Sequence, residues 1–205
     1  MKQEIDPKDT NRAIAFELWT KSPMPMVTIT KTFDVTRLRK VSRRRGMKFN
    51  MLLCWCIGRA ASRIEEFYML PQNDKLYRYD RMAVNVIVNN IKGGLSFCDV
   101  AVCDDLETFN DNYLRLTETI RQTCRDILDE EAVIVGTSAV TGTELDCIVN
   151  QYNGIFNNPF LSWARYRKGW FRTTLPISFQ FHHAQMDGCQ AARFLDEVQR
   201  IINRL

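Results

Sequence analysis

The chain has 205 residues, 45% of them apolar and 25% charged, which is typical of a globular protein with a substantial buried core. No apolar run is long enough to span a membrane, and a net charge of +4 is too small to indicate a nucleic-acid partner. The N-terminus carries no apolar signal segment. The seven cysteines show neither a CxxC pair nor zinc-ligand spacing. We therefore expect one cytoplasmic domain over residues 1–205, with reduced thiols, no metal and no membrane or nucleic-acid partner.

The first third of the chain predicts helices on either side of one strand. Apolar residues at helical spacing predict a short helix over 9–21, capped by Asp9 or Thr10, and alternation predicts a strand over 26–33. A helix over 35–45 carries a basic run, which we interpret either as a solvated face or as an attraction for a phosphate-bearing ligand. The helix over 49–64 is apolar on most sides and should be buried.

The rest of the chain is rich in strands. We expect strands over 75–79 and 83–88, joined by a turn at Asp80-Arg81, and further strands over 95–102, 133–140 and 160–166. A long helix is predicted over 108–129. The pattern favours the α/β class, as an α+β two-layer sandwich in which a mostly antiparallel or mixed sheet is covered by helices on one face.

The stretch from Pro176 to Gly188 combines a strand, a turn and the start of a helix. Its residues alternate up to His182 and His183, Asp187-Gly188 is a turn pair, and helical spacing follows to Leu205. A neutral imidazole at a strand end can act as a general base near neutral pH. The carboxylate four positions later would orient the ring or fix the turn, and the glycine permits backbone conformations closed to other residues. The alternative is a pair of histidines satisfied by hydrogen bonds at the edge of the core.

The heptapeptide HHAQMDG resembles the HHxxxDG signature of the chloramphenicol acetyltransferases, whose HxxxDG chemistry is shared with the acyltransferase domain of 2-oxoacid dehydrogenase complexes and with plant BAHD acyltransferases. The resemblance extends over nearly the whole chain. It includes the chain length, the Leu-Pro before the last strand, and the segments Asp34-Val35-Thr36, Lys48-Phe49 and Asp74-Lys75-Leu76.

The resemblance implies a homotrimer with active sites between subunits, and a general base at His183. It implies that Arg12 pairs with Asp187 to hold the turn. A hydroxyl that stabilises the oxyanion is implied at Thr141, with Ser138 as the alternative donor because the local register is ambiguous; either could equally be an ordinary strand residue. The catalytic residues so implied are His183, Thr141, Asp187 and Arg12.

The same resemblance implies acetyl-coenzyme A as the acetyl donor, bound by Lys48, Arg165 and Tyr166. It implies an acceptor pocket near Leu18, Trp19 and Val27, where this chain departs most from the family. We therefore expect O-acetylation of a small molecule, with chloramphenicol as the first candidate, which would make the chain an antibiotic-resistance enzyme. The alternatives are another alcohol, such as a sugar or a different xenobiotic, and a ligand-binding protein without turnover. A transacetylase of a dehydrogenase complex would normally add a lipoyl domain, which this sequence lacks.

Overall fold

The computed structural model describes all residues from 1 to 205 and contains two sheets. The larger sheet has the order β2-β10-β8-β7-β5-β6, and β9 pairs with β10 beside this path. The β5–β7 and β7–β8 pairs are parallel and the other pairs are antiparallel. Its strands are β2 (Met26–Asp34), β5 (Met82–Asn89), β6 (Leu95–Ala101), β7 (Val133–Val140), β8 (Phe160–Ala164), β9 (Arg167–Lys168) and β10 (Thr173–His182).

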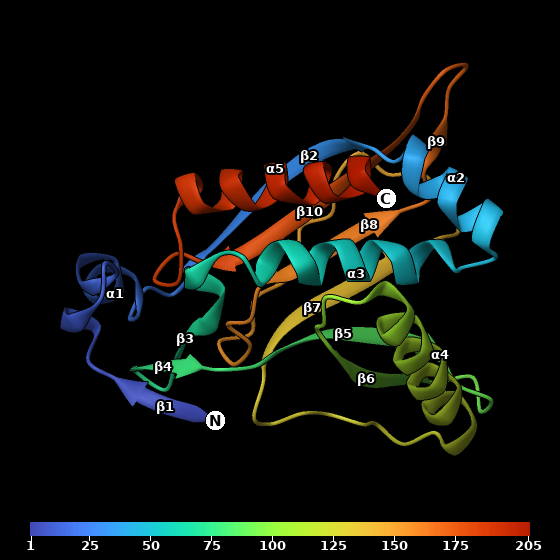
Figure 1. The fold of residues 1–205 in the computed structure, drawn as a ribbon. Helices are drawn as coiled ribbons and strands as arrows, with labels where there is room; N and C mark the ends of the chain where they lie inside the picture. Colours follow the sequence, from blue (N-terminus) through green and yellow to red (C-terminus); the bar gives the residue numbers. More distant parts are fainter.

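Helices cover one face of this mixed sheet, as the sequence predicted (Figure 1). The α2, α3 and α5 helices lie side by side over β10 and its neighbours, and α4 packs against β5 and β6. A smaller sheet of order β1-β4-β3 stands beside the N-terminal helix α1. These elements are α1 (Ala13–Trp19), α2 (Thr36–Arg45), α3 (Phe49–Ala61), α4 (Leu106–Thr123), α5 (Gly188–Arg204), β1 (Lys2–Ile5), β3 (Met69–Gln72) and β4 (Lys75–Tyr79), with 3-10 turns at Pro7–Asp9 and Glu65–Tyr68.

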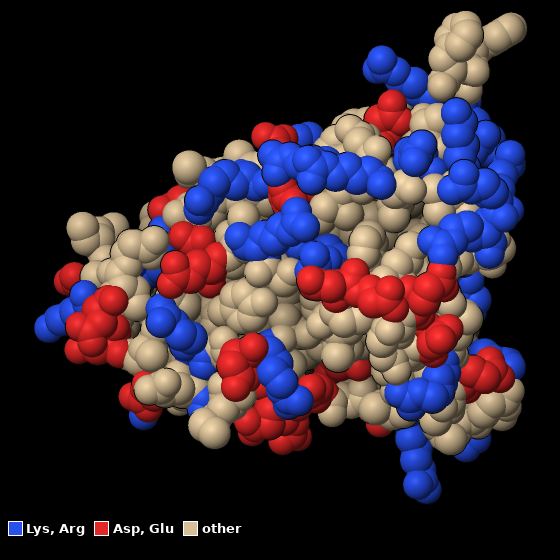
Figure 2. Space-filling model, in the orientation of Figure 1, with Lys and Arg blue, Asp and Glu red and all other residues tan.

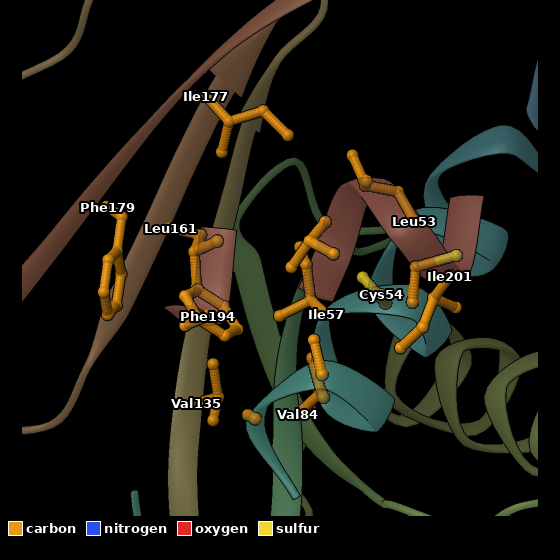
Figure 3. Close-up of a cluster of buried hydrophobic side chains, with 14 of the residues drawn as sticks. Leu53, Cys54, Ile57, Val84, Val135, Leu161, Ile177, Phe179, Phe194 and Ile201 are labelled. Atoms are coloured by element: carbon orange, nitrogen blue, oxygen red, sulfur yellow. The ribbon is translucent and has the colours of Figure 1, made fainter. Parts of the chain in front are cut away.

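The core fills the space between the sheet and the helices as one continuous cluster of 40 buried apolar residues, so the two layers are held by a shared interior. Figure 3 shows strand side chains such as Ile177 and Leu161 facing Leu53 and Ile57 of α3 and Phe194 of α5. The periodicity of α5 predicted this face, because its apolar residues recur every three or four positions.

The strand β10 is buried on both faces. On the face away from the helices, Ser178 Oγ accepts a hydrogen bond from the Ile148 amide at 2.8 Å, and the Gln180 side chain donates to the Asn150 carbonyl at 2.9 Å. The irregular segment 141–159 therefore packs across the back of the sheet and satisfies the polar half of the alternating strand.

The predicted element ends differ most from the structure in two helices. The predicted helix over 108–129 stops at Thr123, because Cys124 takes a left-handed conformation (φ 55°) and Ile127 instead bridges to Cys98 of β6. At its start, Asp105 accepts a hydrogen bond from the Thr108 amide and so caps the helix two residues earlier than expected. The predicted helix over 9–21 is also shorter, because Pro7–Asp9 forms a separate 3-10 turn and α1 spans Ala13–Trp19.

The strands expected over 75–79 and 83–88 are both present, but they belong to different sheets. The strand β4 pairs with β3 through a turn in which Asn73 and Asp74 both have positive φ, whereas β5 belongs to the larger sheet. The strands β1 and β3 were not predicted from the sequence, because each has four residues and is too short to show a clear alternation.

Candidate active site

The end of β10 holds His183 in a fixed position. Its backbone N–H donates to the Pro25 carbonyl at 2.8 Å, and the Trp19 ring stacks on the imidazole with centroids 4.7 Å apart and planes 10° apart. Nδ1 lies 3.1 Å from Asp187 Oδ1 but off the line of a hydrogen bond, and this nitrogen is buried. Because the side chain is still 29% exposed, the open edge of the ring is the one that carries Nε2.

Arg12 fixes the turn that follows His183. Its guanidinium donates to both carboxylate oxygens of Asp187 at 2.6 and 3.0 Å, and it also donates to the carbonyls of His183 and Ala184. The Arg12 side chain is 3% exposed and that of Asp187 is 45% exposed, so the ion pair sits at the rim of the core. The hydrogen bonds from the Arg12 guanidinium to the carboxylate hold the pKa of Asp187 below its ordinary value.

Two further residues, which were not predicted as site residues, stabilise this turn. The Gln190 side-chain oxygen accepts from the Asp187 amide at 3.0 Å, and its nitrogen contacts the buried carboxylate of Glu66 at 3.4 Å. The spacing of Asp187 and Gln190 matches a capping box, a signal present in the sequence. The expectation that position 188 uses the conformational freedom of glycine is wrong. The φ of Gly188 is not positive, and a Cβ added there would have no atom within 4 Å.

His182 points to the other side of the strand and is 1% exposed. Its Nδ1 accepts a hydrogen bond from the Ala184 amide at 3.1 Å, which fits a neutral ring. Burial, with a smaller contribution from the nearby His183, lowers the pKa of His182 from 6.5 to about 4. His182 is therefore a structural residue of the turn.

We expect His182 to make the protein lose stability in mild acid. Between pH 6.5 and about pH 4 the unfolded chain binds a proton at His182 that the folded chain does not, so the free energy of unfolding falls as pH falls through this window. The loss should be on the order of 3 kcal/mol. Urea unfolding at pH 7, 5.5 and 4 measures it. In His182→Asn, whose side-chain oxygen can still accept from Ala184, this part of the pH dependence should vanish; an unchanged slope would contradict the assignment.

The other expected site residues gather at the opposite end of the sheet. The Arg165 amide donates to the carbonyl of Thr143, two residues after Thr141, at 2.8 Å, and the Tyr166 ring packs against Phe49 with centroids 5.0 Å apart. Phe49 follows Lys48 at the start of α3. Thr141, Arg165, Tyr166 and Lys48 thus form a second cluster that does not include His183.

The strand register fixes the distance between the two clusters. Ala139 and Ile177 both lie level with Trp163, so Thr141 is two residues beyond this row and His183 is six residues beyond it in the opposite direction. At 3.3 Å per residue, His183 and Thr141 are about 26 Å apart along the sheet. Ser138, the alternative donor, lies level with Ser162 and Ser178 and is also remote from His183. One chain alone does not bring the base and the expected oxyanion donor together.

The expected acceptor residues lie at the His183 end of the sheet. Trp19 lies on the His183 ring, and Val27 pairs with Phe181 and packs against the core. Leu18 is 64% exposed and points into solvent, so the apolar side expected for helix 9–21 is wrong at this position. No His, Cys, Asp or Glu residues form a group of three that could hold a metal, and no helix is both long and apolar enough to cross a membrane.

Known proteins share this architecture over the full chain. The solved structure of a chloramphenicol acetyltransferase superposes with a TM-score of 0.84 at 20% identity, covering 98% of this chain and 100% of that one. The cubic core of the pyruvate dehydrogenase multienzyme complex superposes with a TM-score of 0.61 at 17% identity, covering 93% and 86%. The fold is therefore the one found in these two structures.

Sequence comparison identifies the family to which the chain belongs. The family model for chloramphenicol acetyltransferase matches residues 2–199. Chloramphenicol acetyltransferase 3 of Escherichia coli is 25% identical over 208 residues, covering 98% of this chain and 96% of that protein, and a chloramphenicol acetyltransferase of Clostridium perfringens is 28% identical over 210 residues, covering 96% and 93%. The chain belongs to the chloramphenicol acetyltransferase family and is an O-acetyltransferase of that family, which uses acetyl-coenzyme A.

Proposed function

We propose that residues 1–205 form a single cytoplasmic domain that transfers the acetyl group of acetyl-coenzyme A to a hydroxyl of a small molecule, with His183 as the general base. The proposal is based on how the imidazole of His183 is held and exposed. Its ring is clamped by Trp19 and its backbone by Pro25 and Arg12, while its Nε2 edge remains open. A base held in this way loses little freedom when a substrate hydroxyl arrives.

In the proposed reaction His183 Nε2 removes the proton from the acceptor hydroxyl as its oxygen attacks the thioester carbonyl. A new carbon–oxygen bond forms, and Thr141 donates a hydrogen bond to the resulting oxyanion, with Ser138 as the alternative donor. When the tetrahedral intermediate collapses, the carbon–sulfur bond breaks and the imidazolium returns its proton to the thiolate. No acyl-enzyme is needed. Asp187 and Arg12 act through the ring and the turn.

We infer that the complete site forms between subunits of a homotrimer. A single chain holds His183 and Thr141 about 26 Å apart, so on this proposal the Thr141 hydroxyl that meets the base belongs to another copy. The segment on the back of the sheet supports association because it exposes large apolar side chains: Val149, Ile155 and Phe156 are 69–73% exposed. Light scattering should give three times the 24.0 kDa chain mass.

Chloramphenicol is the first acceptor to test, since the full-length relatives carry that name. The acceptor end, with Trp19 on the His183 ring and Leu18 in solvent, leaves other alcohols as the second candidates. The decisive experiment is a panel of chloramphenicol, amino sugars and other small alcohols with acetyl-coenzyme A, followed by a thiol-reactive dye.

We expect one acceptor class to release coenzyme A thiol at least a hundredfold faster than acceptor-free hydrolysis. His183→Gln, which keeps the size but not the base, is the matched control for background thiol release. Tight binding of an acceptor by calorimetry without thiol release would contradict the proposed transferase activity and would favour a ligand-binding protein.

A further inference from the structure

A buried carboxylate that the proposed chemistry does not use lies beside the turn that joins His183 to Asp187. Glu66 belongs to the 3-10 turn Glu65–Tyr68, and its side chain is only 5% exposed. The one cation within 4 Å is Arg193, whose side chain lies 3.6 Å away and is 57% exposed. A buried carboxylate without a close, buried cation does little to stabilise a fold. The place of Glu66 beside the turn therefore needs another explanation.

The main positive surface of the molecule does not neutralise Glu66. The basic run of α2 forms the largest group of blue side chains in Figure 2, at the end of the molecule away from α1 and the small sheet (Figures 1 and 2). Glu66 lies at the other end, because the Glu65–Tyr68 turn leads directly into β3. The contacts of the carboxylate are instead with the segments on either side of the ion pair.

The Glu66 carboxylate joins the two segments that supply the Arg12–Asp187 pair. Its Oε1 accepts a hydrogen bond from Asn11 Nδ2 at 3.3 Å, and Asn11 directly precedes Arg12. The same oxygen accepts from Gln190 Nε2 at 3.4 Å, and Gln190 Oε1 accepts from the Asp187 amide at 3.0 Å. One oxygen atom therefore connects the neighbour of the arginine with the residue that holds the backbone of the aspartate.

The segment that carries this carboxylate is itself fixed against both sides of the turn. The Phe67 ring lies 5.9 Å from that of Phe179 in β10 and 4.7 Å from that of Phe194 in α5, measured between centroids. The Met69 carbonyl accepts a hydrogen bond from the Gln185 side chain at 2.7 Å, within the turn. A group carried by a segment packed in this way can hold its partners in one arrangement.

We propose that Glu66 is a positioning residue for the general base. By holding the neighbours of the ion pair, it keeps Arg12 and Asp187 aligned, and Asp187 Oδ1 then stays 3.1 Å from Nδ1 of His183. A displacement of about 1 Å at a reacting group can lower a rate by about a hundredfold. The inference rests on the proposed role of His183, and it adds a residue that touches neither the substrates nor the reacting atoms.

The first test compares two substitutions of similar size. In Glu66→Leu, which removes both acceptor oxygens, we expect kcat for acetyl transfer to fall at least tenfold while KM for both substrates stays within twofold. The Tm should stay within about 4 °C of the parent value, because Asn11 and Arg193 are exposed and regain water. Glu66→Gln keeps an acceptor oxygen and should restore kcat to within threefold of the parent. The matched control is Glu65→Leu, at a side chain that is 72% exposed on the same turn, and it should change neither kcat nor KM.

Two further measurements separate positioning from a general loss of packing. In an Arg12→Met background, Glu66→Leu should lower kcat by less than a further twofold, because the pair through which Glu66 acts is already broken. The chain has two histidines, so labelling with ¹⁵N-histidine gives two sets of ring signals in NMR spectra. In Glu66→Leu the signals of His183 should shift more than those of His182.

Asn11→Asp tests the same link without changing a buried residue. It places a second carboxylate against Glu66 from an exposed position, and it should lower kcat at least fivefold. Four results would overturn the inference: a kcat within twofold of the parent in Glu66→Leu or Asn11→Asp, equal losses in the two Glu66 variants, additive effects with Arg12→Met, or unchanged His183 signals. A parent chain that releases no thiol with any acceptor contradicts the transferase proposal instead, and the NMR comparison still tests how the ring is held.

Discussion

Replacing His183 by alanine should lower kcat for acetyl transfer by about 10²- to 10⁴-fold, the usual contribution of a positioned general base. The loss should appear in kcat rather than in KM for acetyl-coenzyme A, because the second cluster, with Arg165 and Tyr166, is remote from this ring. The measurement is steady-state thiol release with the best acceptor of the panel.

The fold should survive this substitution. The contacts that hold the turn use the backbone of His183, namely its N–H to Pro25 and its carbonyl to Arg12, and these remain. The contact with Asp187 and the stacking on Trp19 are lost, and the stacking contributes about 0.5–1.5 kcal/mol beyond the area that it buries. His183→Gln should be as inactive as the alanine variant. A rate within tenfold of the parent in either variant would show that another group removes the proton.

Replacing Arg12 by methionine should lower the free energy of unfolding by about 3 kcal/mol, toward the lower end of the range for breaking a buried ion pair from one side. The lower end applies because Asp187 is 45% exposed and regains water, whereas the carbonyls of His183 and Ala184 lose a donor in a buried position. Urea unfolding at pH 7 measures the change. The matched control is Arg43→Met on the exposed face of α2, where no ion pair is lost and the change should stay within about 0.5 kcal/mol.

The pH dependence gives this prediction a second signature. Because the pKa of Asp187 in the folded chain is below its ordinary value, the pair stabilises the fold above that ordinary value and the stabilisation is lost as pH falls through the lowered one. The difference between the parent and Arg12→Met should therefore be constant above about pH 5 and shrink below about pH 4. In an Asp187→Asn background, most of the difference in unfolding free energy caused by Arg12→Met should disappear. Equal stability of Arg12→Met and Arg43→Met at pH 7 would contradict the structural role of the pair.

Much of the fold could be predicted because local patterns and packing agree. The strand 133–140 is observed with the predicted bounds, and the turn after His183 begins an amphipathic helix as expected. The prediction was wrong where one residue overrides the periodicity, as at Cys124, whose left-handed conformation ends α4 while apolar residues continue to Ile127. The short strands β1 and β3 depend on pairing with β4, a tertiary contact that local spacing does not encode.

The site was predictable to a different extent. Motif resemblance suggested that Arg12 and Asp187 meet, and their side chains do form a bidentate pair across 175 positions of sequence. The stacking of Trp19 on His183 and the contact of Glu66 with Gln190 were not foreseen, because they depend on how α1 and the Glu65–Tyr68 turn pack against α5. The capping box of Asp187 and Gln190, by contrast, could have been read from their spacing. The separation of His183 from Thr141 follows from strand register, which no linear motif reports.

The arrangement of the two clusters has a consequence for how activity is regulated by concentration. On the proposed assembly, each folded chain carries two unfinished halves of a reaction centre, one at each end of its sheet. Dilution would then make correctly folded chains inactive, because they would separate. A substitution on the back of the sheet could likewise abolish turnover without changing a reacting group. Inactivity in a variant of this protein would need to be read together with its state of association before it is ascribed to chemistry.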